Sequence, residues 1–217
     1  MAGNQPNAYA LSQRLMRKGL IRKIRRNLYS AVNLLTNEVI ASKYQIACAI
    51  SETAYLCLYT AAELHGLVEL ECQEVQVSSE SLFNNFKFQE SSYKLVSHKI
   101  NGGIVAKGPG IRTTDVERTL LDAANQPMSV GGIKTLVSIV ERLSFLNESK
   151  LTDYLDAYNS RSLYQKVGFL LSTYTSGISS DFFHLCQERM GSGTRYFSQE
   201  SRTDGVFDCR WQIVLPK

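Results

Sequence analysis

The spacing of apolar residues near the N-terminus predicts a short helix. Leu11 and Leu15 lie four positions apart, so both face one side of a helix over residues 9–18. Gly19 follows directly, at the position where helices most often end. We therefore expect a helix of about three turns whose other sides are polar.

Two runs of strand-forming residues come next. Residues 20–24 and 28–32 are rich in aliphatic and aromatic side chains, and a short polar segment separates them. Asn27 in that segment tolerates the left-handed backbone conformation that a tight turn requires. The pattern predicts a two-stranded ribbon directly after the helix. This order is typical of the second half of a winged helix-turn-helix.

The middle of the chain mixes helix and strand patterns. Helices are predicted near 42–50 and 60–65, the second with Thr60 as its cap and Gly66 after its last residue. Strands are predicted at 74–79, 93–99 and 103–107.

A capping-box pattern opens the next predicted helix. Thr114 stands as the N-cap with Glu117 three residues later, and the helix is expected to reach Asn125. Arg118 and Asp122 are four residues apart on this helix, which favours a surface or interdomain ion pair over a catalytic pair. One face is predicted to be core, namely Leu120, Leu121, Ala123 and Ala124.

The C-terminal part is predicted to be mainly helical. Helices are expected at 130–146, 149–158, 161–175 and 180–190. Ser149 and Ser179 are the expected N-caps of two of them, and strands are expected at 195–198 and 207–215. The fold class is therefore α+β. We expect a partial winged helix-turn-helix head over 1–36, followed over 37–217 by a mixed α/β domain with a helical C-terminal part.

Charge is distributed unevenly along the 217 residues. The first 37 residues carry seven basic side chains and no acidic one, whereas the other 180 carry 17 basic and 20 acidic side chains. A basic head on a mildly acidic body suggests a polyanion-binding module attached to a second domain. The alternative is a solvated, charged terminus without a ligand.

The basic head contains the residue types that DNA recognition requires. Ser12, Gln13 and Arg14 on the predicted helix can reach base edges, and Arg17 and Lys18 suit phosphates. The predicted wing would grip phosphates or enter the minor groove through Arg22, Lys23, Arg25 and Arg26. The residues expected to pack this wing onto the helix are Ile24, Leu28 and Tyr29.

A winged helix-turn-helix needs two further helices before its recognition helix. Only about eight residues precede the predicted helix at Tyr9. Either the chain is truncated at its N-terminus, which we favour, or this element has another role. A truncated head is expected to bind DNA weakly or not at all.

Other kinds of chemistry find little support in the sequence. Five cysteines without a CxxC pair suggest a reducing cytoplasm and idle thiols, and no apolar run is long enough to span a bilayer. The three histidines are widely spaced, so we expect no metal site, and His65 is expected to be packed or capping.

A nucleotidyltransferase site built from Gly191, Ser192, Asp204 and Asp208 is disfavoured because its two carboxylates are four residues apart. We expect no cofactor and no catalytic residue.

Two motifs in the body resemble a known family. Residues 59–67 read YTAAELHGL, and residues 111–122 read IRTTDVERTLLD. Together with the ribbon, which ends in Arg26-Asn27-Leu28-Tyr29, they resemble the AbiEi family of abortive-infection antitoxins. The helix at 166–171 and the strand containing Trp211 also fit, so the resemblance covers about residues 9–215. Asn27 stands where that family usually has glycine.

The resemblance implies a function in a type IV toxin–antitoxin system. Such a protein would repress its own operon by binding inverted repeats in promoter DNA. It would also counteract a neighbouring nucleotidyltransferase toxin, without needing a stable complex with it. The alternative is a protein- or RNA-interaction module whose basic head plays a supporting part. An enzyme of unrecognised type is a third, more remote possibility.

Overall fold

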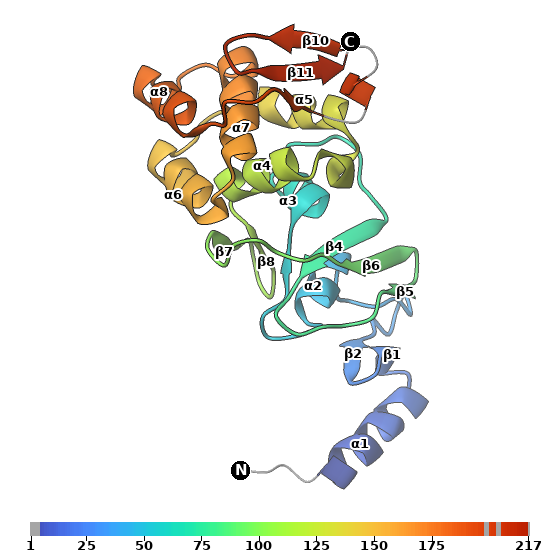
Figure 1. Cartoon of the computed structure of the whole chain (residues 1–217). Coiled ribbons are helices and arrows are strands. Elements are labelled where there is room, and N and C mark those ends of the chain that lie inside the picture. The colour runs from blue at the N-terminus through green and yellow to red at the C-terminus, as the bar shows by residue number, and fades with distance from the viewer. Residues whose placement is uncertain (1–4, 198–199, 203–204, 217) are drawn as a thin grey trace.

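The computed structural model describes residues 5–197, 200–202 and 205–216 of the chain, and it has a mixed α+β fold. The helices are α1 (Gln5–Arg17), α2 (Lys43–Cys48), α3 (Leu58–Leu64), α4 (Val116–Asn125), α5 (Ile133–Glu141), α6 (Glu148–Tyr158), α7 (Arg161–Tyr174) and α8 (Ser180–Arg189), with 3-10 turns η1 (Pro127–Val130) and η2 (Glu200–Arg202). Figure 1 shows them as successive levels, from α1 at one end to the C-terminal helices at the other.

Three sheets accompany these helices. The ribbon pairs β1 (Ile21–Arg25) with β2 (Leu28–Ala31) in antiparallel register. A mixed six-stranded sheet has the order β5-β6-β4-β3-β8-β7, and its strands are β3 (Tyr55–Leu56), β4 (Glu74–Ser78), β5 (Phe86–Phe88), β6 (Ser91–Leu95), β7 (Ile104–Ala106) and β8 (Arg112–Thr114). A C-terminal sheet has the order β10-β11-β9 and consists of β9 (Arg195–Tyr196), β10 (Gly205–Asp208) and β11 (Ile213–Pro216).

The six-stranded sheet separates two hydrophobic clusters. Successive strand residues point to opposite faces, so Tyr55 packs into the cluster of the C-terminal helices and Leu56 into the cluster beneath α2. Val75 and Val77 of β4 join the α2 cluster. The larger cluster is built around α4 and α7, where the predicted apolar face of α4 is fully buried.

Several helix starts differ from the sequence-based predictions. Asp115, not Thr114, caps α4, because Thr114 still belongs to β8, and the Asp115 side chain accepts a hydrogen bond from the Arg118 backbone N–H. Asn147, not Ser149, caps α6 in the same way. The predicted Ser179 cap of α8 is confirmed.

The cap predicted for α3 was also wrong. The N-cap is Cys57, and the hydroxyl of Thr60 accepts a hydrogen bond from the Gln76 backbone N–H instead. Gly66 follows the helix with a φ of +72°, as expected for a residue after a helix C-terminus.

Two long predicted elements differ from the prediction in extent. The predicted helix 130–146 is present as the shorter α5 (Ile133–Glu141), which starts after Gly131 and Gly132 because their φ values of 90° and 91° do not fit a right-handed helix. The predicted strand 207–215 is a hairpin, in which the Asp208 carboxylate accepts a hydrogen bond from the Trp211 backbone N–H across the turn. Ser198, predicted to end a strand, lies outside the described residues.

Candidate nucleic-acid interface

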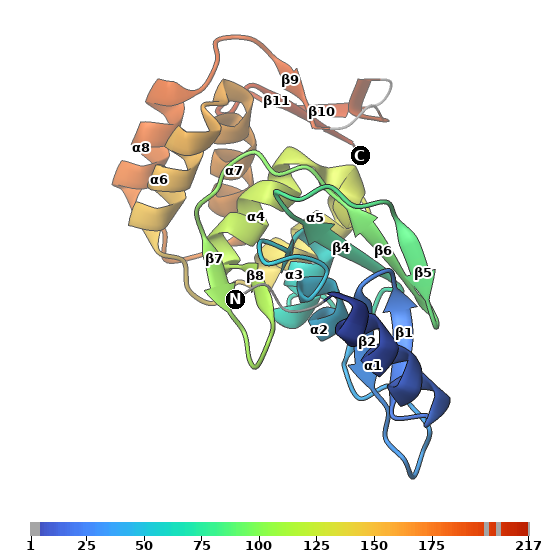
Figure 2. The same ribbon diagram turned by 90° about the horizontal axis from the view of Figure 1, so that it is seen from below.

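The basic head consists of α1 and the β1–β2 ribbon. In Figures 1 and 2 it projects from the body at the end of the molecule opposite α8. The predicted turn is confirmed, since Asn27 has a φ of 60° and Arg25 pairs with Leu28 across it. The described residues form this helix and ribbon, and their assignment to a partial winged helix-turn-helix stays a prediction.

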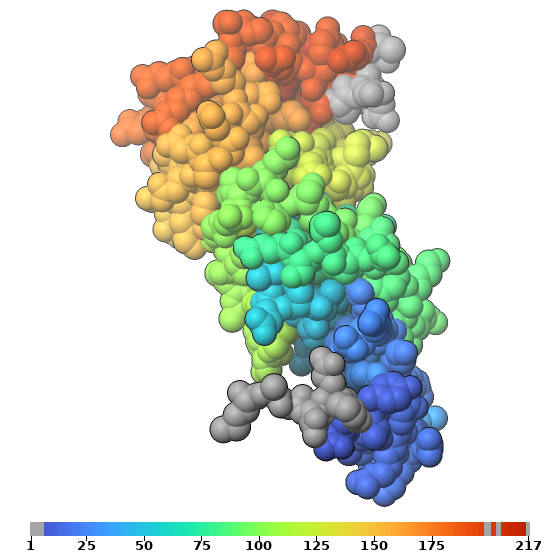
Figure 3. All heavy atoms as spheres, turned by 60° about the horizontal axis from the view of Figure 1, so that its bottom comes forward, coloured from blue at the N-terminus to red at the C-terminus, as the bar shows by residue number. Residues whose placement is uncertain are grey.

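The cations of the head differ in how accessible they are. Arg14, Arg17 and Lys18 are exposed around the C-terminal end of α1. Positive charge at this end interacts favourably with the helix dipole. Lys23 and Arg26 on the ribbon are exposed as well. Figure 3 shows the N-terminal segment that carries them in blue at one extremity of the molecular surface. Five cations of the head are therefore exposed to solvent: Arg14, which was predicted to read base edges, and four predicted phosphate contacts, Arg17, Lys18, Lys23 and Arg26.

Two residues expected to read base edges are less free. Ser12 and Gln13 are half-buried, and the Ser12 hydroxyl donates a hydrogen bond of 2.8 Å to the Tyr9 carbonyl within α1. Hydroxyls in helices often bond to the preceding turn in this way. Of the proposed reading residues, Arg14 is the one that points freely into solvent.

The ribbon packs differently from the prediction for a wing. Ile24 and Leu28 were expected to hold it on the helix, but they pack against the α2 cluster of the body. The guanidinium of Arg25 lies 5.0 Å from the ring centre of Phe86 and 5.6 Å from that of Phe83. This cation–π contact turns Arg25 toward the body. The sequence around Arg25 could not predict this contact, because both rings are more than 55 residues away in the chain.

Arg22 is also engaged within the protein. Its guanidinium donates a hydrogen bond of 3.0 Å to the Asn37 carbonyl in the loop after β2. The free side of the head therefore comprises α1 and the ribbon end next to it. At the other end, Ile24, Arg25 and Leu28 pack against the body, while Arg26 and Asn27 in the turn itself are exposed.

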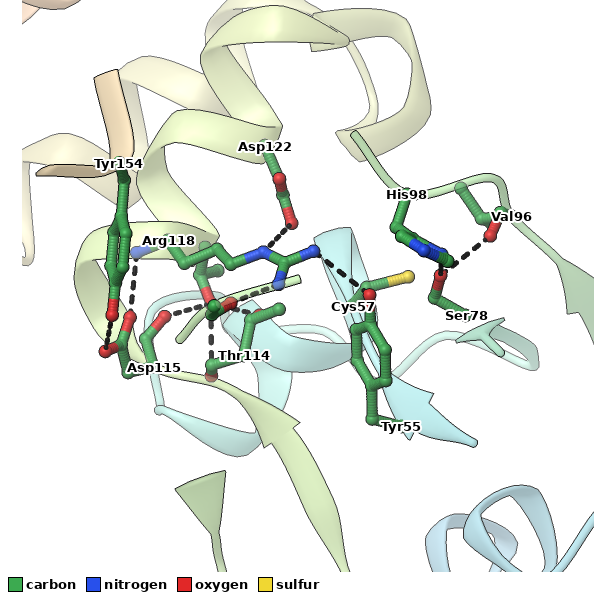
Figure 4. A network of polar contacts seen from close by, with 12 residues as sticks. Tyr55, Cys57, Ser78, Val96, His98, Thr114, Asp115, Arg118, Asp122 and Tyr154 are labelled. Atoms are coloured by element: carbon green, nitrogen blue, oxygen red, sulfur yellow. Dashed lines mark hydrogen bonds and ion pairs between the residues drawn. The ribbon is translucent and has the colours of Figure 1, made fainter. Parts of the chain in front are cut away.

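A second concentration of polar chemistry lies between the six-stranded sheet and the helices, and Figure 4 shows it from close by. Its centre is Arg118, which is fully buried. The Arg118 guanidinium donates to the Tyr55 hydroxyl at 3.0 Å and to the Gly102 carbonyl, and it lies 3.5 Å from Asp122. The predicted Arg118–Asp122 ion pair exists, but it is not a surface pair.

The carboxylates beside Arg118 also have several partners. Asp115 accepts hydrogen bonds from the Tyr154 hydroxyl at 2.8 Å and from Lys150 at 3.0 Å, which raises the pKa of Lys150. Burial raises the pKa of Asp122, opposed by Arg118 and by a hydrogen bond from Tyr158. The sequence pointed to Arg118 and Asp122 of this network but gave Asp115 no role, and the tyrosines come from distant elements and could not be assigned to it.

This network has the character of a structural clamp. The cavity beside it has a volume of about 10 Å³, which is room for about one water molecule. Burial strongly raises the pKa of the adjacent Cys57 thiol, which keeps it protonated and poorly nucleophilic. The hydrogen bonds and the ion pair of the network connect β3, α4 and α6 at the place where the six-stranded sheet meets the helices.

The described part of the chain lacks two further features. Within it, no group of three or more His, Cys, Asp or Glu side chains is arranged to hold a metal ion. None of its helices combines the length and the apolar character needed to cross a membrane. His65 is packed as expected, with Nε2 2.7 Å from the Thr114 carbonyl oxygen. Asp204, part of the disfavoured nucleotidyltransferase pattern, lies outside the described residues.

Comparisons with known proteins bear on the fold. No family model matches the sequence, and no curated protein matches it. The crystal structure of the RV2827C protein from Mycobacterium tuberculosis is similar, with a TM-score of 0.71 over 98% of this chain and 80% of that chain. The two sequences are 16% identical, so the similarity concerns the α+β fold.

Proposed function

We propose that this protein is the antitoxin of a type IV toxin–antitoxin system and a DNA-binding repressor of its own operon. It would act in the cytoplasm without catalysis and counteract a nucleotidyltransferase toxin. The observation that carries the DNA-binding part is the projecting head, on which five cations are exposed and no acidic residue precedes Glu38. The antitoxin part rests on the resemblance of residues 59–67 and 111–122 to the AbiEi family.

The shape of the head suits duplex DNA. Helix α1 has 13 residues, which corresponds to a length of about 20 Å, and a single helix fits the major groove. Cations on its last turns would neutralise phosphates and release counterions, so binding would weaken steeply with salt. Arg14 is the best-placed side chain to contact base edges.

A second candidate function is a protein- or RNA-interaction module. The observation in its favour is the outer face of the C-terminal sheet. There Tyr196 and Phe207 both pair with Val214 across the sheet and are about half exposed, at 46% and 52%. Exposed aromatic rings on a sheet can stack on unpaired bases or anchor a protein partner.

DNA binding can be tested with full-length protein and its own promoter. We expect a triple variant, Arg14→Glu, Arg17→Glu and Lys18→Glu, to lose affinity for all duplexes and to reduce the salt dependence of binding. Each lost phosphate contact should lower the slope of log K against log salt by about 0.9. A control variant, Lys134→Glu with Arg195→Glu, reverses two exposed cations of the body and should bind like the wild type.

The two activities can then be separated in cells. The triple variant should lose repression of a promoter reporter but still rescue growth when the neighbouring toxin gene is expressed. Wild-type protein that shows no preference for its promoter over random duplex would refute the repressor proposal. Failure of the wild type to rescue growth would refute the antitoxin proposal.

A further inference from the structure

The loop after the ribbon exposes two adjacent leucines. Residues 33–38 connect β2 to Val39, which forms an isolated antiparallel bridge with Val32. Leu34 is 70% exposed and Leu35 is 96% exposed at the tip of this loop. Scattered apolar residues are common on protein surfaces, but a neighbouring pair at the tip of a projecting loop is a candidate contact.

Hydrogen bonds hold this loop in a defined shape. The side-chain oxygen of Asn33 accepts a bond of 2.9 Å from the Leu35 backbone N–H, and the Asn33 carbonyl accepts one of 2.7 Å from the Asn37 N–H. Arg22 donates to the Asn37 carbonyl from the neighbouring strand. The leucines are therefore displayed by a preorganised turn, which lowers the entropy cost of a contact made by the tip.

The loop lies at the basic end of the head. The Val32 backbone N–H bonds to the Leu20 carbonyl at 3.0 Å, so the loop follows the ribbon end next to the C-terminus of α1. A cleft of about 310 Å³ at this place is lined by Met16, Lys23, Asn37 and neighbouring residues. Glu38 is the one acidic residue among the first 51 of the chain.

We propose that the Leu34–Leu35 tip enters the minor groove of bound DNA and wedges between base pairs, while the cations of the head hold the flanking phosphates. This inference rests on the proposed DNA-binding function. Apolar side chains inserted in this way unstack a base step and bend the duplex. The turn between β1 and β2 is less available for such an insertion, because Arg25 beside it packs against Phe86 of the body.

Charge and contact size favour DNA over a protein partner at this tip. The exposed cations around the loop complement a polyanion. Two leucine side chains supply a small fraction of the roughly 800 Å² that each partner buries in a stable protein interface. A base step, in contrast, is filled by one or two apolar side chains.

The test compares full-length wild type with a Leu34→Ala, Leu35→Ala variant on the same promoter duplex. The control is Leu70→Ala with Leu82→Ala, which removes leucines that are 76% and 88% exposed on the body. Affinity is measured over a salt series, bending by energy transfer between end labels, and unstacking by 2-aminopurine fluorescence in the duplex. We expect the loop variant to bind at least about tenfold more weakly, without bending or unstacking, and with an unchanged salt slope.

A Glu38→Gln variant gives an independent readout. Because its carboxylate would lie near phosphates, its removal should strengthen binding by several-fold at low salt. Unchanged affinity and bending in the loop variant would overturn the wedge while leaving DNA binding intact. If light scattering shows that the wild type is a dimer and the loop variant is a monomer, the leucines contact a second copy of this chain, and the wedge is overturned. Wild-type protein without promoter preference would overturn both the wedge and the proposed function.

Discussion

The contact between Gly168 and Trp211 makes a sharp prediction about stability. Gly168 lies in the middle of α7, and Trp211 is packed against it with an exposed fraction of 1%. A Cβ atom at position 168 would stand 2.7 Å from Cε3 of the indole and closer still to Cζ3 and Cη2. Ordinary contacts between carbon atoms are about 3.5–4.0 Å, so Gly168→Ala forces the ring to move by about 1 Å.

The magnitude follows from two opposing effects. Alanine is favoured over glycine in a helix by about 1 kcal/mol. Against this, overfilling a packed core costs about 1–3 kcal/mol, and the indole N–H is held by a 2.9 Å hydrogen bond to the Ser172 hydroxyl worth about 1 kcal/mol. We expect Gly168→Ala to lower the free energy of unfolding by about 1–3 kcal/mol despite its better helix propensity.

Urea denaturation measures this change, and the chain's one tryptophan is itself the fluorescent reporter of the contact. Gly193→Ala is the matched control, because a Cβ there meets nothing within 4 Å. It should leave stability unchanged or raise it by up to about 1 kcal/mol. The effect of Gly168→Ala should shrink in a Trp211→Leu background. Equal or greater stability of Gly168→Ala in the wild-type background would refute the reasoning.

Two further predictions concern ion pairs. Arg118→Met should lower the free energy of unfolding by about 3–5 kcal/mol in urea, because it leaves the Asp122 carboxylate buried without its cation. The surface substitution Arg142→Met should cost at most about 1 kcal/mol, and equal effects of the two would contradict the clamp. The hydrogen bond from Arg189 lowers the pKa of the Asp156 carboxyl in the folded protein. The interaction between these two residues therefore stabilises the folded state fully above the unfolded pKa of about 3.9, and this stabilisation is lost as pH falls through the folded pKa. Urea midpoints measured between about pH 5 and pH 2 should therefore fall less steeply for Arg189→Met than for the wild type.

Local sequence signals predicted most elements but not their junctions. Periodicity located α7 and α8, and the Asn27 turn was read correctly because one residue type determines it. The start of the predicted 130–146 helix was wrong, because the apolar spacing continues across Gly131 and Gly132, whose backbone conformation delays the start of α5 to Ile133.

The candidate interface shows the same limit. The sequence identified the cations, and the exposure of Arg14, Arg17 and Lys18 is as expected. The sequence could not predict where the Arg25 side chain lies, since Phe83 and Phe86 contact it only through tertiary packing. The core network around Arg118 likewise joins residues from four segments that no local pattern connects.

The packing of the ribbon on the body has a consequence for evolution and engineering. Ile24 and Leu28 complete a cluster whose other members come from α2 and the six-stranded sheet. A different head joined to this body would have to reproduce these apolar contacts and the cation–π contact between Arg25 and Phe86. Under the proposed repressor function, the head would therefore not be exchangeable as an independent unit, and changes of target sequence would be confined to α1 and the neighbouring loop.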